Sequence, residues 1–227
     1  MKILGIETSS SAFSVAASER GEGVSFLQVE GQGRPSALLT DLIDRALRQA
    51  GWTLTDLDAL AVSIGPGSFT GLRVGVMTVK TLGWALKKPV LPVSSLEVMA
   101  QNGWERTGPI LSFVDARKGK VYSAPFSAGG KLPVRRLGED RLLPPEEALR
   151  EAPEGGLVIG DGLRRYEELV RSHGGGKLLL AQDSLWTPRA DHLCALAAAA
   201  WPAGRLDDPH SLVPHYLYSR NSDIVGW

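Results

Sequence analysis

The stretch SIGPGSFTGLRVGVMTVKTLGWAL, residues 63–86, constrains the fold more than any other part of the sequence. It runs from a glycine-rich loop into a predicted helix over residues 68–86, whose apolar residues point around the full circumference. A helix that is apolar on every side must be covered on every side. Gly71, Gly75 and Gly83 fall at four-residue multiples on one face, and the lack of side chains there would let another helix pack closely. The pattern fits a core helix of a layered fold or a helix that pairs with a second subunit.

The loop before this helix does not match the common nucleotide-binding motifs. Its glycines, Gly65, Gly67 and Gly71, are spaced one residue longer than the dinucleotide fingerprint requires, and a proline lies between the first two. No Lys followed by Ser or Thr comes after the loop, which excludes a P-loop. Although a helix N-terminus attracts anions, we interpret the loop chiefly as a strand-to-helix turn in which Ser68 or Thr70 caps the helix.

The order of predicted elements is the same in the two halves of the chain. Short apolar and β-branched runs, followed by amphipathic stretches, predict strands over 1–7, 12–18, 24–29, 60–64 and 89–93 and helices over 36–50, 68–86 and 94–104. Glu97, three residues after Ser94, predicts a capping box at the last of these helices. The second half gives strands over 110–115, 120–126, 134–137, 157–159 and 177–180 and helices over 146–151, 163–171 and 189–201.

Two βββαβαβα units in tandem predict an α/β protein of the ribonuclease-H-like type. This unit is duplicated in the superfamily that contains actin, sugar kinases and chaperone ATPases, and the second unit here is shorter and degenerate. We expect an N-terminal actin-like subdomain over residues 1–104, which carries the dimerisation helices, and a smaller C-terminal one over residues 105–227. The fold alone assigns no function, because many activities share it.

The composition narrows the classes of function. The 25 basic and 25 acidic residues give zero net charge, so any RNA contact must be local or shared with a partner. The single cysteine, Cys194, and the lack of an apolar run long enough to span a membrane predict a soluble cytoplasmic protein. The histidine spacing predicts no metal site, and no Ser, His and Asp constellation can be assigned.

The first predicted hairpin corresponds to a phosphate loop of the actin-like superfamily. Active members carry an Asp and small polar residues there, where this chain has Glu7, Thr8, Ser9 and Ser10. A carboxylate that is one methylene longer moves its oxygens by about an ångström, and such a displacement can cost about 100-fold in rate. The four residues therefore fit a residual nucleotide or phosphate loop, or a polar β-turn, which Ser and Thr favour.

The second predicted hairpin departs further from a phosphate loop. Asp115 is present, but Arg117, Lys118 and Lys120 crowd the turn and no glycine pair follows. These three cations are candidates for contact with phosphate or tRNA, while a solvated hairpin tip is the commoner meaning of such a run. Further along, Asp161 lies between two glycines and marks either a remnant of a nucleotide loop or a turn.

Several motifs, taken together and in order, resemble one bacterial protein family. They are ILGIETSSSAFSVAAS, LDALAVSIGPGSFTGLRVGVMTVKTLGWAL, VLPVSSLEVMA, FVDARKGKVYSA and IGDGLRRY. With these motifs the chain resembles the tRNA threonylcarbamoyladenosine biosynthesis family TsaB, also called YeaZ. The resemblance covers most of residues 1–170, and GPGSFTGLRVG and DARKGKVY are its most specific motifs.

The resemblance implies an actin-like protein of two subdomains that has lost catalysis and holds no metal. It implies a scaffold that pairs with a catalytic TsaD-type paralogue and works with a TsaE-type ATPase. ATP and metal then belong to the partner subunits, and tRNA is reached through the complex. In that family the first two helices pair with the same helices of the paralogue, or of a second copy in a homodimer, as a four-helix bundle.

On this basis the glycines of the second helix make room for a partner helix. The resemblance places at the partner interface Leu38, Leu42, Gly71, Leu72, Gly75, Val76, Val79 and Gly83. Gly75→Leu should then break partner binding and leave the fold intact. The alternatives are an ATPase or phosphotransferase of the same superfamily, which intact paired phosphate hairpins would have favoured, and a glycoprotease-type peptidase, which has fewer residues in its support.

Overall fold

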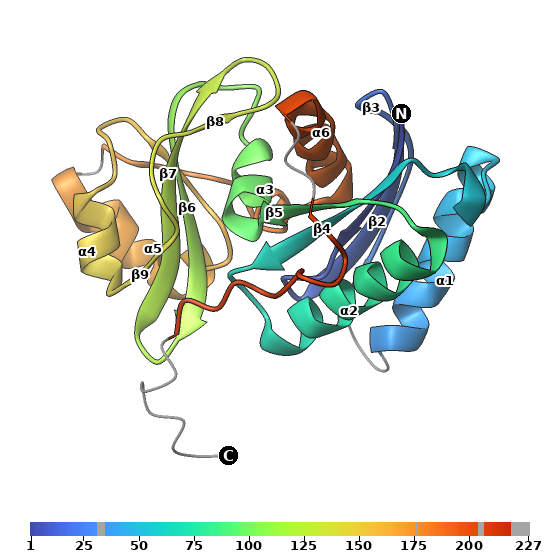
Figure 1. The fold of residues 1–227 in the computed structure, drawn as a ribbon. Coiled ribbons are helices and arrows are strands. Elements are labelled where there is room, and N and C mark those ends of the chain that lie inside the picture. The colour runs from blue at the N-terminus through green and yellow to red at the C-terminus, as the bar shows by residue number, and fades with distance from the viewer. Residues whose placement is uncertain (31–34, 176, 204–206, 219–227) are drawn as a thin grey trace.

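The computed structural model describes residues 1–30, 35–175, 177–203 and 207–218. It contains two β-sheets side by side, with helices between them and on their outer faces (Figure 1). In these residues no helix is long and apolar enough to cross a membrane. The two sheets build separate apolar cores, and the space where they meet holds the candidate site.

The first sheet is formed by the first half of the chain. Its strands are β1 (Lys2–Glu7), β2 (Ala12–Glu19), β3 (Glu22–Glu30), β4 (Ala59–Gly65) and β5 (Val90–Ser94). They lie in the order β3-β2-β1-β4-β5, with β2 antiparallel to β1 and β3, and with β4 parallel to β1 and β5. The apolar run of β1 is buried almost throughout because helices cover both faces of this sheet.

Four helices cover the first sheet. The helices α1 (Pro35–Ala50) and α2 (Phe69–Leu86) lie on one face, while α3 (Ser95–Gln101) and α6 (Ala190–Ala200) lie on the other, between the two sheets (Figure 1). Gly5 of β1 permits the close approach of α6, since a Cβ at this position would lie 2.6 Å from Cys194 Sγ. The last helix of the second half thus packs on the sheet of the first half.

The second sheet repeats the topology of the first. It contains β6 (Thr107–Arg117), β7 (Lys120–Gly129), β8 (Arg135–Arg136), β10 (Leu157–Ile159) and β11 (Leu179–Leu180) in the order β11-β10-β6-β7-β8, and β9 (Arg141–Leu143) pairs with β7. Its outer side carries α4 (Pro145–Arg150) and α5 (Leu163–Ser172) (Figure 1). If β9 is left aside, both sheets place their strands in the order third, second, first, fourth and fifth, which confirms the duplicated fold.

The second unit is degenerate, as expected, because its outer strands have only two residues. Single 3₁₀ turns connect elements at Leu54–Asp56, His173–Gly175, Asp183–Leu185 and Trp201–Ala203. The structure adds β9, which the sequence did not predict. It also ends α3 at Gln101 rather than at residue 104.

The capping box predicted at α3 is wrong. The Ser94 side chain makes no capping hydrogen bond to the helix, and its hydroxyl donates instead to Asp140 Oδ2 at 2.7 Å. The Glu97 carboxylate accepts a hydrogen bond from Arg136 Nε at 3.2 Å. Arg136 ends β8 and Asp140 lies in the loop that follows it, so tertiary contacts of both side chains replace the local one.

The segment 207–218, which we call the strap, returns to the first sheet and then crosses to the second (red trace, Figure 1). Val90 and Asp207 form an antiparallel bridge, and Lys80 Nζ donates to the carbonyls of His210 and Leu212 at 3.1 and 3.0 Å. At its end, the Tyr218 hydroxyl donates to the Ala116 carbonyl of β6 at 3.0 Å. The strap and α6 therefore link the two halves, and the division at residue 104 stays a prediction.

Candidate functional site

A cleft of about 870 Å³ lies between the two halves, at the carboxyl ends of β1, β4 and β6. Ligand sites of open α/β sheets form in this position, where connections leave the ends of parallel strands. The turn after β1, the start of α2, the turn after β6 and the strap all contribute to its walls. The cleft thus brings together the two hairpins that the sequence analysis compared with the phosphate loops of the actin-like superfamily.

Glu7, at the end of β1, is completely buried. Its carboxylate accepts hydrogen bonds from the Ser9 backbone N–H at 2.6 Å and from the Ser63 hydroxyl. Burial raises the pKa of the Glu7 carboxyl above its ordinary value, and these hydrogen bonds offset the rise only in part. The carboxylate is therefore hydrogen-bonded within its own chain, and Glu7 is not among the residues that line the cleft.

The next two residues of the hairpin are bonded to α2. The Thr8 hydroxyl donates to the Gly71 carbonyl at 2.8 Å, and the Ser68 backbone N–H donates to the Ser9 carbonyl at 2.7 Å. Thr8 is fully buried, whereas Ser9, Ser10 and Ser11 line the cleft wall, where the Ser10 hydroxyl donates to the Ala12 carbonyl. Two donors that could hold a phosphate, the Thr8 hydroxyl and the Ser9 backbone N–H, are already used within the chain.

The glycines of the loop and of α2 serve this contact with the hairpin. A Cβ at Gly67 would clash with the Ser9 carbonyl, and one at Gly71 or Gly75 would clash with Thr8. At Gly83 a Cβ would lie 2.8 Å from Pro209 Cγ in the strap. The close approach that the glycine face permits is therefore made within the chain in this structure, and the pairing of these glycines with a partner helix stays a prediction.

The other predicted interface residues are also covered by the chain itself. Leu38 is half-buried, and the remaining ones are buried against the first sheet, the hairpin or the strap: Leu42, Gly71, Leu72, Gly75, Val76, Val79 and Gly83. The exposed face of α2 instead carries Met77 and Trp84, which are 58% and 65% exposed. The sequence did offer a signal for this face, since Thr70, Arg73 and Thr81 share it and are polar.

The turn between β6 and β7 places the predicted cations at the cleft. Arg117 and Lys118 line it, in left-handed backbone conformations with φ of 65° and 49°, whereas Lys120 begins β7, half-buried and away from the cleft wall. Arg117 Nη1 lies 3.3 Å from Asp115 Oδ2, and its backbone N–H also donates to the Asp115 carboxylate. Asp115 is thereby neutralised by its own turn.

Asp161, the glycine-flanked residue after β10, also lines the cleft. Its Oδ1 accepts a hydrogen bond from the Asp115 backbone N–H at 3.0 Å, which joins the two sequence-predicted loops. Burial raises the pKa of the Asp161 carboxyl, and the charge of Asp115 raises it further. Among the described residues, no three His, Cys, Asp or Glu side chains are grouped so that they could hold a metal ion.

Sequence reasoning missed the aromatic residues of the cleft. Phe69 from α2 and Tyr216 from the strap lie together at its wall, with ring centroids 5.3 Å apart. The guanidinium of Arg73 lies 3.9 Å from the centroid of the Phe69 ring. No local pattern predicts that Tyr216 joins Phe69 and Arg73, because Tyr216 is more than a hundred residues further along the chain and reaches them only through the strap.

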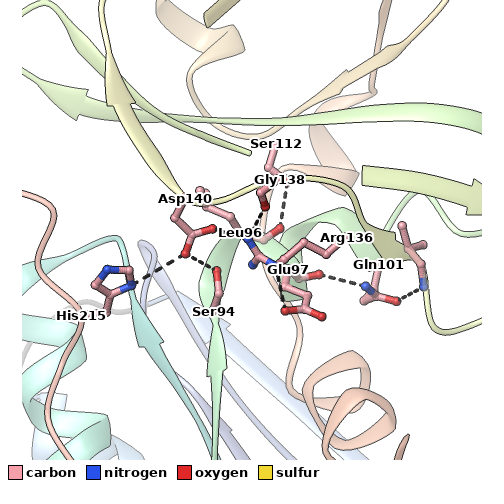
Figure 2. Close-up of polar contacts among 10 residues, drawn as sticks. Ser94, Leu96, Glu97, Gln101, Ser112, Arg136, Gly138, Asp140 and His215 are labelled. Atoms are coloured by element: carbon pink, nitrogen blue, oxygen red, sulfur yellow. Dashed lines mark hydrogen bonds and ion pairs between the residues drawn. The ribbon is translucent and has the colours of Figure 1, made fainter. Parts of the chain in front are cut away.

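A polar cluster beside the cleft bears on the peptidase alternative. Figure 2 shows Asp140 between Ser94 and His215, and the His215 Nδ1 atom lies 3.8 Å from the Asp140 carboxylate, which also accepts the Ser94 hydroxyl. In a serine hydrolase the His bridges Ser and Asp and removes the Ser proton. Here Asp140 occupies the middle position, so His215 does not activate Ser94 as a nucleophile.

Arg136 organises the same cluster. It forms ion pairs with Glu97 and with Asp140, at 3.2 and 2.7 Å, and donates to the Gly138 carbonyl (Figure 2). Asp140 has a side chain only 5% exposed, so its charge is compensated by a buried network rather than by water. The cluster fixes the loop between β8 and β9 against α3, which is a structural role.

Comparison with known proteins shows which sequences are similar to this chain. A family model described as TsaD, tRNA N6-adenosine threonylcarbamoyltransferase, matches residues 34–165. A protein of Escherichia coli named tRNA threonylcarbamoyladenosine biosynthesis protein TsaB is 29% identical over 100% of this chain and 97% of its own. The protein of that name from Bacillus subtilis is 33% identical over 71% of this chain and 70% of its own.

Solved structures agree with the sequence relatives. YeaZ from Pseudomonas aeruginosa superposes with a TM-score of 0.83 and 29% identity, over 95% of this chain and 99% of that one. An activator of 2-hydroxyisocaproyl-CoA dehydratase from Clostridium difficile, with bound ADPNP, has a TM-score of 0.52 and 9% identity over 90% of this chain and 96% of that one, so this likeness concerns the fold alone.

The family model spans more than half of the chain, and the Bacillus subtilis relative is similar over more than two thirds of both chains. The chain belongs to the TsaB (YeaZ) family and shares the TsaD family model.

Proposed function

We propose that this chain is a non-catalytic scaffold in tRNA threonylcarbamoyladenosine biosynthesis, and that it pairs with a TsaD-type transferase subunit. Family membership supports the pathway, because the relatives with similarity along most of the chain are named for it. The observation that carries the non-catalytic assignment is the first hairpin, whose Thr8 hydroxyl donates to the Gly71 carbonyl of α2 and whose Ser9 backbone N–H donates to the Glu7 carboxylate. An active phosphate loop needs donors of this kind directed at the nucleotide.

The second hairpin supports the same assignment. Asp115 is paired with Arg117 from its own turn, and the turn residues Arg117 and Lys118 replace the glycines that let a backbone approach phosphate closely. ATP and metal ions in this pathway would then be held by partner subunits, the TsaD-type paralogue and a TsaE-type ATPase. The cytoplasm, where tRNA is modified in bacteria, is the compartment that this proposal implies.

The outer face of α2 is the surface we assign to the partner. Met77 and Trp84 are exposed on it, and Leu38 of the neighbouring α1 is half-buried beside the same core. Exposed large apolar side chains on a helix face are a sign of a protein contact, and aromatic residues such as Trp contribute most to binding at such contacts. This corrected surface keeps the predicted pairing of the first two helices but changes the residues that make it.

The pairing is tested by native mass spectrometry of this chain with the TsaD-type paralogue from the same organism. We expect a one-to-one complex with the wild type, and loss of it in Met77→Glu/Trp84→Glu. Leu137→Glu is the matched control, because Leu137 is 48% exposed and belongs to the second half of the chain. Removing an aromatic hot spot costs about 2 kcal/mol or more, which is roughly thirtyfold in affinity.

A second measurement separates the scaffold from the enzymatic alternatives. Threonylcarbamoyl transfer to tRNA by the reconstituted TsaD-type and TsaE-type subunits should require this chain, and the transfer should fall with Met77→Glu/Trp84→Glu but not with Leu137→Glu. The isolated chain should not turn over ATP. No complex with the paralogue, together with ATP turnover by the isolated chain, would replace the scaffold with an ATPase or phosphotransferase.

A further inference from the structure

The wall of the cleft carries exposed aromatic rings that the core does not need. Phe69 is 47% exposed and Tyr216 is 43% exposed, although each has a large apolar ring. Their centroids are 5.3 Å apart with a 38° tilt, so the two rings are not stacked flat on each other. Arg73 lies over Phe69 and belongs to the same group. We call Phe69, Arg73 and Tyr216 the aromatic corner.

Cations lie across the same cleft from the aromatic corner. The Arg117 side chain is 83% exposed, and Lys118 beside it is also exposed. Arg117 and Lys118 both have left-handed backbone conformations. Such a conformation costs a non-glycine residue about 1 kcal/mol or more. Because the whole chain has no net charge, this gathering of cations is local.

We propose that the aromatic corner, with Arg117 and Lys118, binds a single-stranded segment of RNA, with an unstacked base on the Phe69 and Tyr216 rings and phosphates at the cations. Proteins that bind single strands combine aromatic rings, on which bases stack, with cations along the backbone path, and loops with unstacked bases are the commonest targets of RNA-binding proteins. The inference rests on the proposed function, which supplies a tRNA with an exposed anticodon loop.

The two carboxylates of the cleft, Asp115 and Asp161, each accept a backbone hydrogen bond from the chain itself. Asp115 is only 10% exposed and is paired with Arg117, so it presents little negative charge to a phosphate at the mouth of the cleft. The aromatic corner differs from the phosphate hairpin of the superfamily, because its rings come from α2 and the strap. Ser9, Ser10 and Ser11 of the first hairpin line the same cleft, although the Thr8 hydroxyl is bonded to α2.

The test measures binding of the full chain, in complex with the TsaD-type paralogue, to a fluorescently labelled anticodon stem-loop RNA and to a fully paired RNA duplex. Phe69→Ala/Tyr216→Ala should weaken stem-loop binding by about tenfold and leave the salt dependence unchanged. Arg117→Gln/Lys118→Gln should lower the slope of log affinity against log salt by about 0.7 for each phosphate that the protein no longer neutralises.

Two controls match these variants. Arg171→Gln/Lys177→Gln removes two exposed cations from the far part of the second half, and Val213→Ala removes an exposed apolar side chain from the strap itself. Both should bind the stem-loop as the wild type does. Crosslinking with 4-thiouridine in the loop should place the crosslinked peptide at residue 69 or 216.

The outcomes separate this inference from the proposed function. Unchanged stem-loop affinity in Phe69→Ala/Tyr216→Ala, with pairing to the paralogue retained, would overturn the RNA site and leave the scaffold in place. Equal affinity for duplex and stem-loop would overturn base stacking. Loss of pairing in the aromatic variants, with stem-loop affinity kept by the isolated chain, would make the aromatic corner a protein contact. Failure of the wild type to pair with the paralogue would count against the proposed function first.

Discussion

Glu7 is a carboxyl group buried without a cationic partner, and it gives the stability of this protein an unusual pH dependence. Its carboxylate accepts from Ser9 and Ser63, but burial is the larger influence and raises the pKa above the ordinary value of 4.5. The folded chain therefore holds this proton more tightly than the unfolded chain. Between the two pKa values, stability falls as the pH rises, opposite to the behaviour of an acid in a salt bridge.

Glu7→Gln removes the charge but keeps the shape of the side chain, an acceptor for Ser9 and a donor for Ser63. We expect the wild type to lose stability relative to this variant as the pH rises above 4.5, because only the wild type must bury a charge. Urea denaturation from pH 4 to 8 measures the difference, with Glu19→Gln at the exposed end of β2 as the control. A difference that stays constant with pH would contradict the burial of an ionisable group at residue 7.

At the scale of elements, the glycine face of α2 is either open to a partner helix or packed against the first hairpin, and a substitution distinguishes the two. Alanine favours a helix over glycine by about 1 kcal/mol, so Gly75→Ala should stabilise a helix whose glycine face is open to a partner. In this structure the new methyl group would clash with the Thr8 side chain, and such overpacking destabilises by about 1–3 kcal/mol. We therefore expect Gly75→Ala to destabilise the isolated chain.

A double-mutant cycle with Thr8→Ala tests the contact directly. Removing the Thr8 hydroxyl should relieve the clash, so the cost of Gly75→Ala should fall by more than about 0.5 kcal/mol in the Thr8→Ala background. The free energies of unfolding of the four proteins give the coupling. If Gly75→Ala stabilised the wild-type background, Gly75 would not be packed against Thr8, and its face of α2 would be open to a partner helix.

The helices and strands themselves were largely predictable, but their orientation was not. The period of apolar residues predicted both long helices of the first half, and the Gly-containing turn after residue 115 predicted the β6–β7 hairpin. In α2 the apolar residues nearly surround the helix, and the polar residues Thr70, Arg73 and Thr81 were the one sequence signal for its exposed face. The capping box at α3 failed for a related reason, since Asp140 and Arg136 compete for Ser94 and Glu97 from outside the helix.

At the scale of the whole molecule, the duplication was predictable and the cleft was not. The order of elements repeats along the sequence, and short connections leave few topologies for such an order. The cleft depends on the strap, an extended segment without periodicity, whose contacts join residues far apart in the chain. The Tyr218 hydroxyl reaches a carbonyl 102 residues away, and Lys80 Nζ reaches one 130 residues away. Phe69 and Tyr216 become neighbours only through such contacts.

The strap should therefore be part of the cooperative unit rather than an appendage. Leu212 is 2% exposed and belongs to the core of the first half, whereas the next residue, Val213, is 67% exposed. Leu212→Ala should cost about 2–5 kcal/mol, the usual range for a buried leucine, while Val213→Ala should stay within about 0.5 kcal/mol.

Urea denaturation followed by far-UV circular dichroism and by tryptophan fluorescence measures both variants. Because the strap and α6 connect the two sheets, we expect the two signals to give one coincident transition in the wild type and in Leu212→Ala, shifted to lower urea in the variant. Equal stability of the two variants would mean that the strap detaches without affecting the core. The aromatic corner and the cleft would then lack the residues that the strap contributes, and the RNA site would have to form on the partner complex instead.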